Sequence, residues 1–333
     1  MIDRSKPRAG AAPSERDLSI LLEEFFRNSF ATDNPLITEA VRRMLAAGGK
    51  RLRPRLTLLA AEAHGGDARA HLPLAAYMEL IHVGTLIHDD VVDRADTRRG
   101  VNATAVDFGN RVSVLAGDYL FAWIFKNVTA KYAPPVPNIL ATALADITDG
   151  EVLQHRAVGN LGLSVAAYTD IAIKKTATLF AASAECGAIV AGAQALRVKA
   201  LRDYGLYYGI AFQMLDDLLD LTASSSELGK PVGNDLLERK MTIPLIFALQ
   251  GRDGEFRAAI ARLYGGQEPS AAAIGPLIAA LRDAGGFAKT RDAIAGYVER
   301  AKMSLAPLGL GPARAELAEL ADALARESAA RTR

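Results

Sequence analysis

The spacing of apolar residues limits the fold more than any other feature of this chain. They recur three or four positions apart along almost all 333 residues. This spacing gathers apolar side chains on one face of an α-helix, whereas a half-buried strand needs strict alternation, which we find over no convincing stretch. Half of the residues are hydrophobic, which is enough for a sizeable core. The sequence therefore predicts an all-α fold built as a large helical bundle.

No linker long enough to separate two halves interrupts this pattern. We expect a flexible polar tail over residues 1–13 and a single domain over residues 14–333. Turn-like Gly, Pro and Ser clusters divide the domain into helices. The predicted helices span about residues 14–31, 34–64, 73–96, 104–132, 137–158, 167–190 and 197–222, with several shorter ones after 240.

Charge and composition exclude several classes of protein. The net charge of +1 gives no overall field for nucleic acid or an acidic membrane surface. The single cysteine, Cys186, excludes an internal disulfide framework and fits a reducing compartment. Because no signal-peptide pattern and no apolar run of about 18 residues occur, we expect a cytoplasmic protein without a transmembrane segment. Peripheral membrane contact during product release stays compatible with this prediction.

Two aspartate motifs carry the strongest chemical signal. LIHDDVVD (residues 86–93) and QMLDDLLD (residues 213–220) each close an apolar segment with Asp-Asp-apolar-apolar-Asp. Residues four apart lie on one helical face, so each motif presents two carboxylates together. Buried carboxylates at this density repel one another unless cations neutralise them, and Mg²⁺ prefers oxygen ligands and phosphates. The repeated motif therefore predicts a metal site that binds phosphate.

Basic residues accompany these motifs. Arg98 and Arg99 follow the first motif, and GGKRLRPRL (residues 48–56) concentrates four more cations. Guanidinium groups can hold phosphate oxygens bidentately. The second cluster is not a Walker A loop, since no Ser or Thr follows Lys50. The two clusters together indicate two polyanionic ligands, one on the metals and one on side chains.

Seven motifs in this order resemble those of the trans-polyprenyl diphosphate synthases, long-chain type. They are GGKRLRP, ELIHVGTLIHDDVVDRADTRRG, AGDYLF, GEVLQ, KKTATLF, FQMLDDLLD and GKPVGNDLLERKMTIPL. The resemblance implies an isoprenoid-synthase helical bundle around a central cavity, usually a homodimer, that condenses isopentenyl diphosphate with an allylic diphosphate. It also implies three Mg²⁺ per active site, which Mn²⁺ can replace.

The resemblance also assigns roles to individual residues. The metal ligands implied are Asp89, Asp90, Asp93, Asp216, Asp217 and Asp220. The allylic diphosphate would be held by Arg98, Lys175, Lys230 and Lys240, and isopentenyl diphosphate by Lys50, Arg53, His82 and Arg99. Thr176 and Gln213 match residues of the reaction centre.

Product length should depend on the residues one to two turns before Asp89, namely Ile81, Gly84 and Thr85. Short-chain members of the family carry bulky aromatic residues there, so the small Gly84 and Thr85 favour a long product, for example a quinone side chain. Three alternatives stay open: a short-chain farnesyl or geranylgeranyl diphosphate synthase, a class I terpene cyclase, and a regulatory subunit of a heteromeric synthase. The two intact aspartate motifs argue against the last two.

Overall fold

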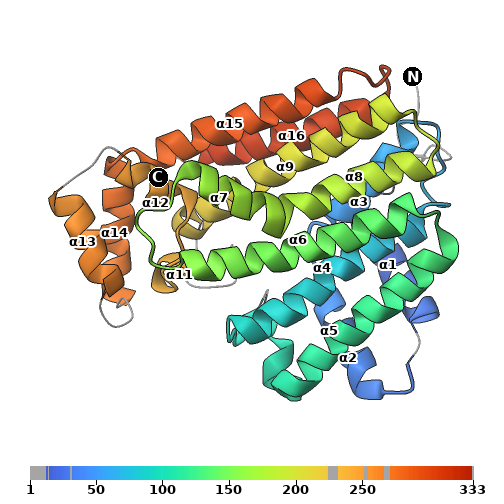
Figure 1. The fold of residues 1–333 in the computed structure, drawn as a ribbon, viewed down its shortest axis with the longest axis horizontal. Helices are drawn as coiled ribbons and strands as arrows, with labels where there is room; N and C mark the ends of the chain where they lie inside the picture. Colours follow the sequence, from blue (N-terminus) through green and yellow to red (C-terminus); the bar gives the residue numbers. More distant parts are fainter. Residues whose placement is uncertain are drawn as a thin grey trace. The chain divides into compact units, whose positions relative to one another are not determined.

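The computed structural model describes residues 13, 15–30, 32–98, 100–223, 232–250, 254–265 and 271–331. Most of these residues are helical, which confirms the predicted all-α class (Figure 1). Within the described ranges, the only strands are β1 (Thr97–Arg98) and β2 (Val101–Asn102), which form a short antiparallel hairpin. No helix in this part of the chain has the length and apolarity needed to cross a bilayer.

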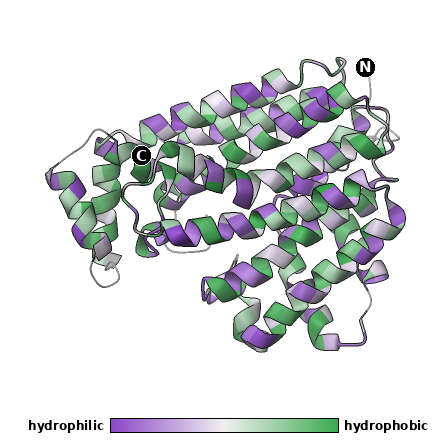
Figure 2. Ribbon diagram, viewed as in Figure 1, coloured by the Kyte–Doolittle hydropathy of each residue, from purple (hydrophilic) through white to green (hydrophobic). Residues whose placement is uncertain are grey.

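Most helices carry both hydrophobic and hydrophilic segments, as amphipathic packing requires (Figure 2). In chain order they are α1 (Glu15–Ser29), α2 (Pro35–Ala46), α3 (Leu52–Glu62), α4 (Leu72–Val92), α5 (Thr104–Lys131), α6 (Pro135–Ala157), α7 (Val165–Ala172), the π-helical turn η1 (Ile173–Ala177), α8 (Thr178–Val190), α9 (Ala195–Thr222), α11 (Asn234–Leu237), α12 (Ile243–Leu249), α13 (Glu255–Gly265), α14 (Ala271–Asp283), α15 (Gly286–Ser304) and α16 (Pro312–Ala330).

Internal contacts divide the chain into two compact units. Unit 1 comprises Met1–Leu144, Leu179–Arg202 and Ala306–Leu317, and unit 2 comprises Ala145–Thr178, Asp203–Leu305 and Ala318–Arg333. Helices α6, α8, α9 and α16 contribute residues to both units. The single domain over residues 14–333 stays a prediction, as does the tail, of which only residue 13 lies within the described residues.

The helix predicted over residues 34–64 is wrong, because the chain breaks between α2 and α3. Gly48 and Gly49 have φ angles of +81° and +135°, and Arg51 has a φ of +46°. Such positive angles are incompatible with a right-handed helix, and glycine adopts them at little steric cost. The break leaves the GGKRLRP segment as a loop that leads into α3, so its charged residues are not arranged as a helical stripe.

In unit 1, α4 packs closely along α5. The approach needs small residues, because a Cβ on Gly84 would lie 2.6 Å from Cε1 of Phe121, and a Cβ on Gly117 would overlap the His88 ring. Further along the same pair, Tyr77 and Trp123 form an edge-on aromatic contact with ring centroids 5.8 Å apart. These contacts fix the helix that carries the first aspartate motif.

Two glycine-to-alanine variants, one in α8 and one in a control helix, test the packing of α8 in unit 1. A Cβ on Gly187 would overlap the backbone carbonyl of Thr57, so Gly187→Ala must force α3 and α8 apart. We expect it to lower the free energy of unfolding by about 1–3 kcal/mol. Gly296→Ala is the matched control, since nothing lies within 4 Å of its added Cβ in α15. It should stabilise the protein by about 0.5–1 kcal/mol through helix propensity. Chemical denaturation measures both, and equal effects would contradict this packing.

Candidate functional site

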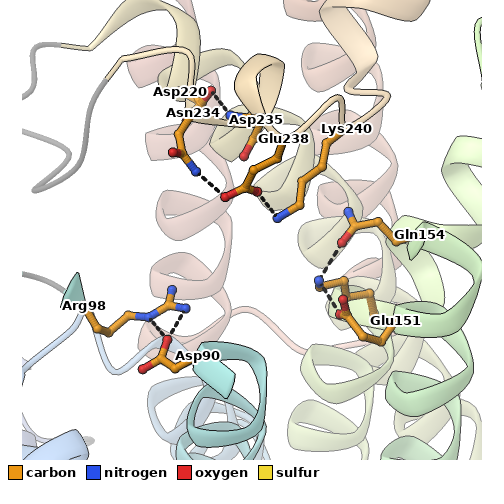
Figure 3. Close-up of polar contacts among 10 residues, drawn as sticks. Asp90, Arg98, Glu151, Gln154, Asp220, Asn234, Asp235, Glu238 and Lys240 are labelled. Carbon is orange, nitrogen blue, oxygen red and sulfur yellow. Dashed lines mark hydrogen bonds and ion pairs between the residues drawn. The ribbon is translucent and has the colours of Figure 1, made fainter. Parts of the chain in front are cut away.

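The first aspartate motif ends α4, and its middle residue is buried. Asp90 is fully buried, and its Oδ1 accepts a hydrogen bond from Nε of Arg98 (2.7 Å) and forms an ion pair with Nη2 of the same residue (2.5 Å) (Figure 3). Arg98 lies in β1, so this pair brings the hairpin back onto the end of α4. By contrast, Asp89 is half-buried and Asp93, the C-cap of α4, is exposed. The motif thus divides into one internal carboxylate and two that reach solvent.

The negative charge of the buried Asp90 carboxylate is only partly compensated by the groups around it. Burial raises the pKa of this carboxyl, Arg98 opposes the rise, and the charge of Asp93 adds to it. Its second oxygen, Oδ2, is buried and has no hydrogen-bond partner among the described residues. A buried carboxylate oxygen without a donor favours a nearby cation, because an unsatisfied buried charge is costly.

The second aspartate motif, in α9 of unit 2, shows the same division. Asp216 is exposed, whereas Asp217 is 4% exposed. Asp217 Oδ2 accepts hydrogen bonds from the Tyr168 hydroxyl (2.7 Å) and the Ile243 amide (3.1 Å), and Oδ1 accepts one from Gln213 Nε2 (2.9 Å). Burial raises the pKa of Asp217 to about 7, and these three donors oppose the rise. Its hydrogen bonds favour a structural role for Asp217 over direct metal binding.

The last aspartate of this motif anchors the segment that follows it. Asp220 is 1% exposed, and its Oδ2 accepts a hydrogen bond from the backbone amide of Asp235 at 3.1 Å (Figure 3). The Gly233 amide donates to the Asp220 carbonyl at 2.7 Å. These bonds hold the start of α11 against the end of α9.

The predicted reaction centre lies at the π-helical turn η1. The Thr176 hydroxyl donates to Gln213 Oε1 at 2.6 Å, so the predicted pair is in direct contact. Gln213 Nε2 donates to Asp217, which orients the amide so that its oxygen faces Thr176. Single π-helical turns within α-helices often occur at functional sites. Gly150 permits the close approach of α6 here, since an added Cβ would lie 2.5 Å from the Lys175 amide.

The described cations predicted to hold the allylic diphosphate are each paired with a carboxylate. Arg98 pairs with Asp90, as described above. Lys175 forms an ion pair with Glu151 and donates to Gln154 Oε1 at 2.6 Å (Figure 3). Lys240 forms an ion pair with Glu238 at 2.6 Å. Phosphate oxygens that bind any one of these cations must therefore compete with its carboxylate partner. Lys230, the fourth predicted cation, lies outside the described residues.

The cations predicted to hold isopentenyl diphosphate belong to unit 1. Lys50 is exposed in the loop before α3. Arg53 is half-buried, and its guanidinium carbon lies 4.4 Å from the centroid of the Phe180 ring. Such a cation–π contact favours the position of the guanidinium group over the ring face. His82 is half-buried on α4, and Arg99 lies outside the described residues.

The predicted chain-length residues differ in their surroundings. Ile81 is fully buried in the core of unit 1. The Phe121 ring fills the space beside Gly84, so a small residue here serves helix packing. Thr85 is half-buried, and its hydroxyl donates a hydrogen bond to the His82 carbonyl at 2.8 Å. Of the three residues, Thr85 is the one whose side chain is partly exposed.

Sequence reasoning assigned no role to several residues that position these groups. Tyr168 holds Asp217, and Glu151 with Gln154 holds Lys175. The motif GEVLQ contains the latter two, but its spacing gives no indication of their partner. Tyr168 carries no sequence signal, because its contact with Asp217 joins residues 49 positions apart.

The arrangement of the carboxylates suits Mg²⁺ that is bound together with water and substrate phosphates better than a metal ion that is bound by protein side chains alone. Within the described residues, no three His, Cys, Asp or Glu side chains converge as a preformed metal centre. Mg²⁺ commonly binds through one or two carboxylates and completes its octahedron with water and substrate phosphates. The solvent-reaching carboxylates suit that type of site, and the unpartnered Oδ2 of Asp90 favours a cation close to them.

The division within the second motif predicts unequal effects on stability. Asp217→Ala leaves three donors without an acceptor, so the free energy of unfolding should fall by roughly 2–5 kcal/mol. Asp216→Ala removes an exposed carboxylate and should change it by no more than about 0.5 kcal/mol. Urea denaturation of the two variants without metal measures the difference. Equal losses would contradict the inward placement of Asp217.

Comparison with known proteins identifies the family. The polyprenyl synthetase family model matches residues 34–280. Octaprenyl diphosphate synthase of Escherichia coli is 38% identical over 87% of this chain and 90% of its own. The structure of a decaprenyl diphosphate synthase from Rhodobacter capsulatus is similar, with 40% identity, a TM-score of 0.87, and coverage of 94% of this chain and 97% of that one.

A polyprenyl synthase from Caulobacter crescentus, solved with calcium and isoprenyl diphosphate, has 37% identity and a TM-score of 0.87. The match covers 96% of this chain and 99% of that one. Both sequence and fold therefore agree over nearly the whole length. The chain belongs to the polyprenyl synthetase family of prenyltransferases.

Proposed function

We propose that this protein is a Mg²⁺-dependent polyprenyl diphosphate synthase that adds isopentenyl diphosphate to an allylic diphosphate and makes a long all-trans product. The observation that carries the proposal is the presence of both complete aspartate motifs in a chain that resembles long-chain synthases over nearly its full length. The Caulobacter relative, solved with calcium and isoprenyl diphosphate, supports divalent metal and prenyl diphosphate as ligands.

The solvent-reaching aspartates are the proposed metal ligands. Asp89, Asp93 and Asp216 would hold Mg²⁺, with Asp90, Asp217 and Asp220 fixing the local structure around them. Bound Mg²⁺ supplies electrostatic stabilisation of the charge that develops on the leaving diphosphate. The side chains of Arg98, Lys175 and Lys240 would exchange their carboxylate partners for phosphate oxygens when the allylic substrate binds.

The protein's dipoles would then stabilise the allylic cation. Because the Thr176 hydroxyl donates its hydrogen bond to Gln213, the lone pairs of the hydroxyl oxygen can face a positive charge. Apolar helix surfaces around such a centre exclude water that would capture the cation. Isopentenyl diphosphate, held by Lys50, Arg53 and His82, supplies the double bond that attacks it. The proton lost afterwards would pass to the released diphosphate.

A product assay tests this proposal. Full-length protein is incubated with labelled isopentenyl diphosphate, farnesyl diphosphate and Mg²⁺, and the products are separated by length. We expect a linear chain longer than geranylgeranyl diphosphate, no turnover in chelator, and recovery with Mg²⁺ or Mn²⁺. A product of farnesyl or geranylgeranyl length would contradict the long-chain assignment. A cyclic hydrocarbon would indicate a terpene cyclase, and no turnover by the protein alone would indicate a subunit of a heteromeric enzyme.

Thr85 offers the sharpest test of product length. Its half-buried side chain lies one turn before Asp89, so Thr85→Phe should obstruct a prenyl tail that leaves the metal site along α4. Overpacking by about 1–3 kcal/mol would favour release by roughly fivefold to a hundredfold over another addition. We expect a shorter product with the first condensation retained, measured by chromatography of the prenyl alcohols. Unchanged product length in an active variant would show that the tail follows another route.

Two further expectations remain predictions. The family resemblance supports a homodimer, which analytical ultracentrifugation can test. A cytoplasmic location likewise stays a prediction from the sequence.

A further inference from the structure

We propose that the buried ion pair between Arg51 and Glu79 positions the isopentenyl diphosphate site without contacting the substrate. This inference rests on the proposed function, because it concerns the site assigned to Lys50, Arg53 and His82. Arg51 lies within the same basic segment as two of these cations but plays a different role from theirs.

Arg51 faces the interior of unit 1. It is 3% exposed, and Glu79 on α4 is 4% exposed. Arg51 Nη1 donates to Glu79 Oε1 at 2.6 Å, and Nη2 donates to the Leu45 carbonyl at 2.5 Å. One guanidinium group therefore joins the last turn of α2, the start of α3 and the middle of α4. A side chain this buried and engaged cannot reach a ligand in solvent.

The ion pair links the two segments that carry the predicted ligand-binding side chains. Lys50 directly precedes Arg51, and Arg53 follows it by two residues. On α4, His82 lies three residues after Glu79, which places it nearly one helical turn further along. Fixing Arg51 on Glu79 therefore fixes the loop and the first turn of α3 relative to the helix that carries His82.

The backbone of Arg51 indicates that this position is imposed by its partners. Arg51 has a φ of +46°, in the left-handed region that a non-glycine residue rarely occupies. It is the N-cap of α3, and its carbonyl accepts the Arg55 amide at 3.1 Å. Its side chain makes no capping bond. Because such a conformation costs free energy, the bonds to Glu79 and Leu45 must hold it in place.

The effect of the ion pair on protein stability can be separated from its effect on substrate binding by removing the charges of both Arg51 and Glu79. A buried ion pair can often be replaced by apolar residues without loss of stability, whereas the loss of one partner leaves an uncompensated charge. We therefore compare Arg51→Met, Glu79→Gln and the double variant Arg51→Met/Glu79→Leu. Arg55→Met is the matched control, since Arg55 lies on the same helix and pairs with the partly exposed Glu316.

The measurements use full-length protein. Calorimetry with Mg²⁺ and without allylic substrate gives the Kd for isopentenyl diphosphate, steady-state kinetics gives KM for each substrate, and thermal unfolding gives Tm. We expect both single variants to raise Kd and KM for isopentenyl diphosphate by about tenfold or more. This is the effect of losing one charge-assisted contact between the substrate and a displaced Lys50 or Arg53. KM for the allylic substrate should change little. The double variant should regain Tm but keep the raised Kd.

Several outcomes would overturn the inference. Recovery of Kd together with Tm in the double variant would show that the pair only stabilises the fold. Equal changes in KM for both substrates, or a Kd equal to that of the wild type in a folded single variant, would also overturn it. So would a raised Kd of the same size in Arg55→Met. Wild-type protein that binds no isopentenyl diphosphate would refute the proposed site itself, a result distinct from failure of the ion pair alone.

Discussion

The cost of burying a carboxylate governs how each aspartate motif is built. Asp217 is 4% exposed, and a carboxylate buried to this extent without partners would be strongly destabilising. Its three donors come from α7, α9 and the first residue of α12, so a single side chain ties three elements of unit 2 together. In unit 1, Arg98 performs the corresponding task for Asp90 and thereby fixes the hairpin at the end of α4.

This constraint explains how adjacent aspartates acquire different roles. Successive residues on an α-helix point about 100° apart, so a residue held inward turns its neighbour toward the helix surface. Asp216 is exposed beside the buried Asp217, and Asp89 is half-buried beside Asp90. The same hydrogen bonds orient Gln213 and, through it, the Thr176 hydroxyl. Structural support and the proposed chemistry therefore depend on one polar network in unit 2.

Helical periodicity was sufficient to predict the fold class, and the motifs were sufficient to predict the family. The break between α2 and α3 escaped the prediction because apolar spacing continues through it, while the glycines at 48 and 49 determine the backbone. Spacing could not distinguish Arg51 from Arg53 either, since burial of Arg51 depends on Glu79, 28 residues away. Gly84 suggested open space, but the Phe121 ring of another helix fills it. Each difference arises from a tertiary contact that local sequence does not specify.

A crystal structure with Mg²⁺ and an unreactive allylic thiolodiphosphate would test the central claim most directly, namely that the middle aspartates are structural and their neighbours bind metal. We predict carboxylate oxygens of Asp89, Asp93 and Asp216 at about 2.0–2.1 Å from Mg²⁺. In that structure, Asp217 should keep its hydrogen bonds to Tyr168 and Ile243. Direct coordination of Mg²⁺ by Asp217, with the Tyr168 hydroxyl displaced, would contradict the claim.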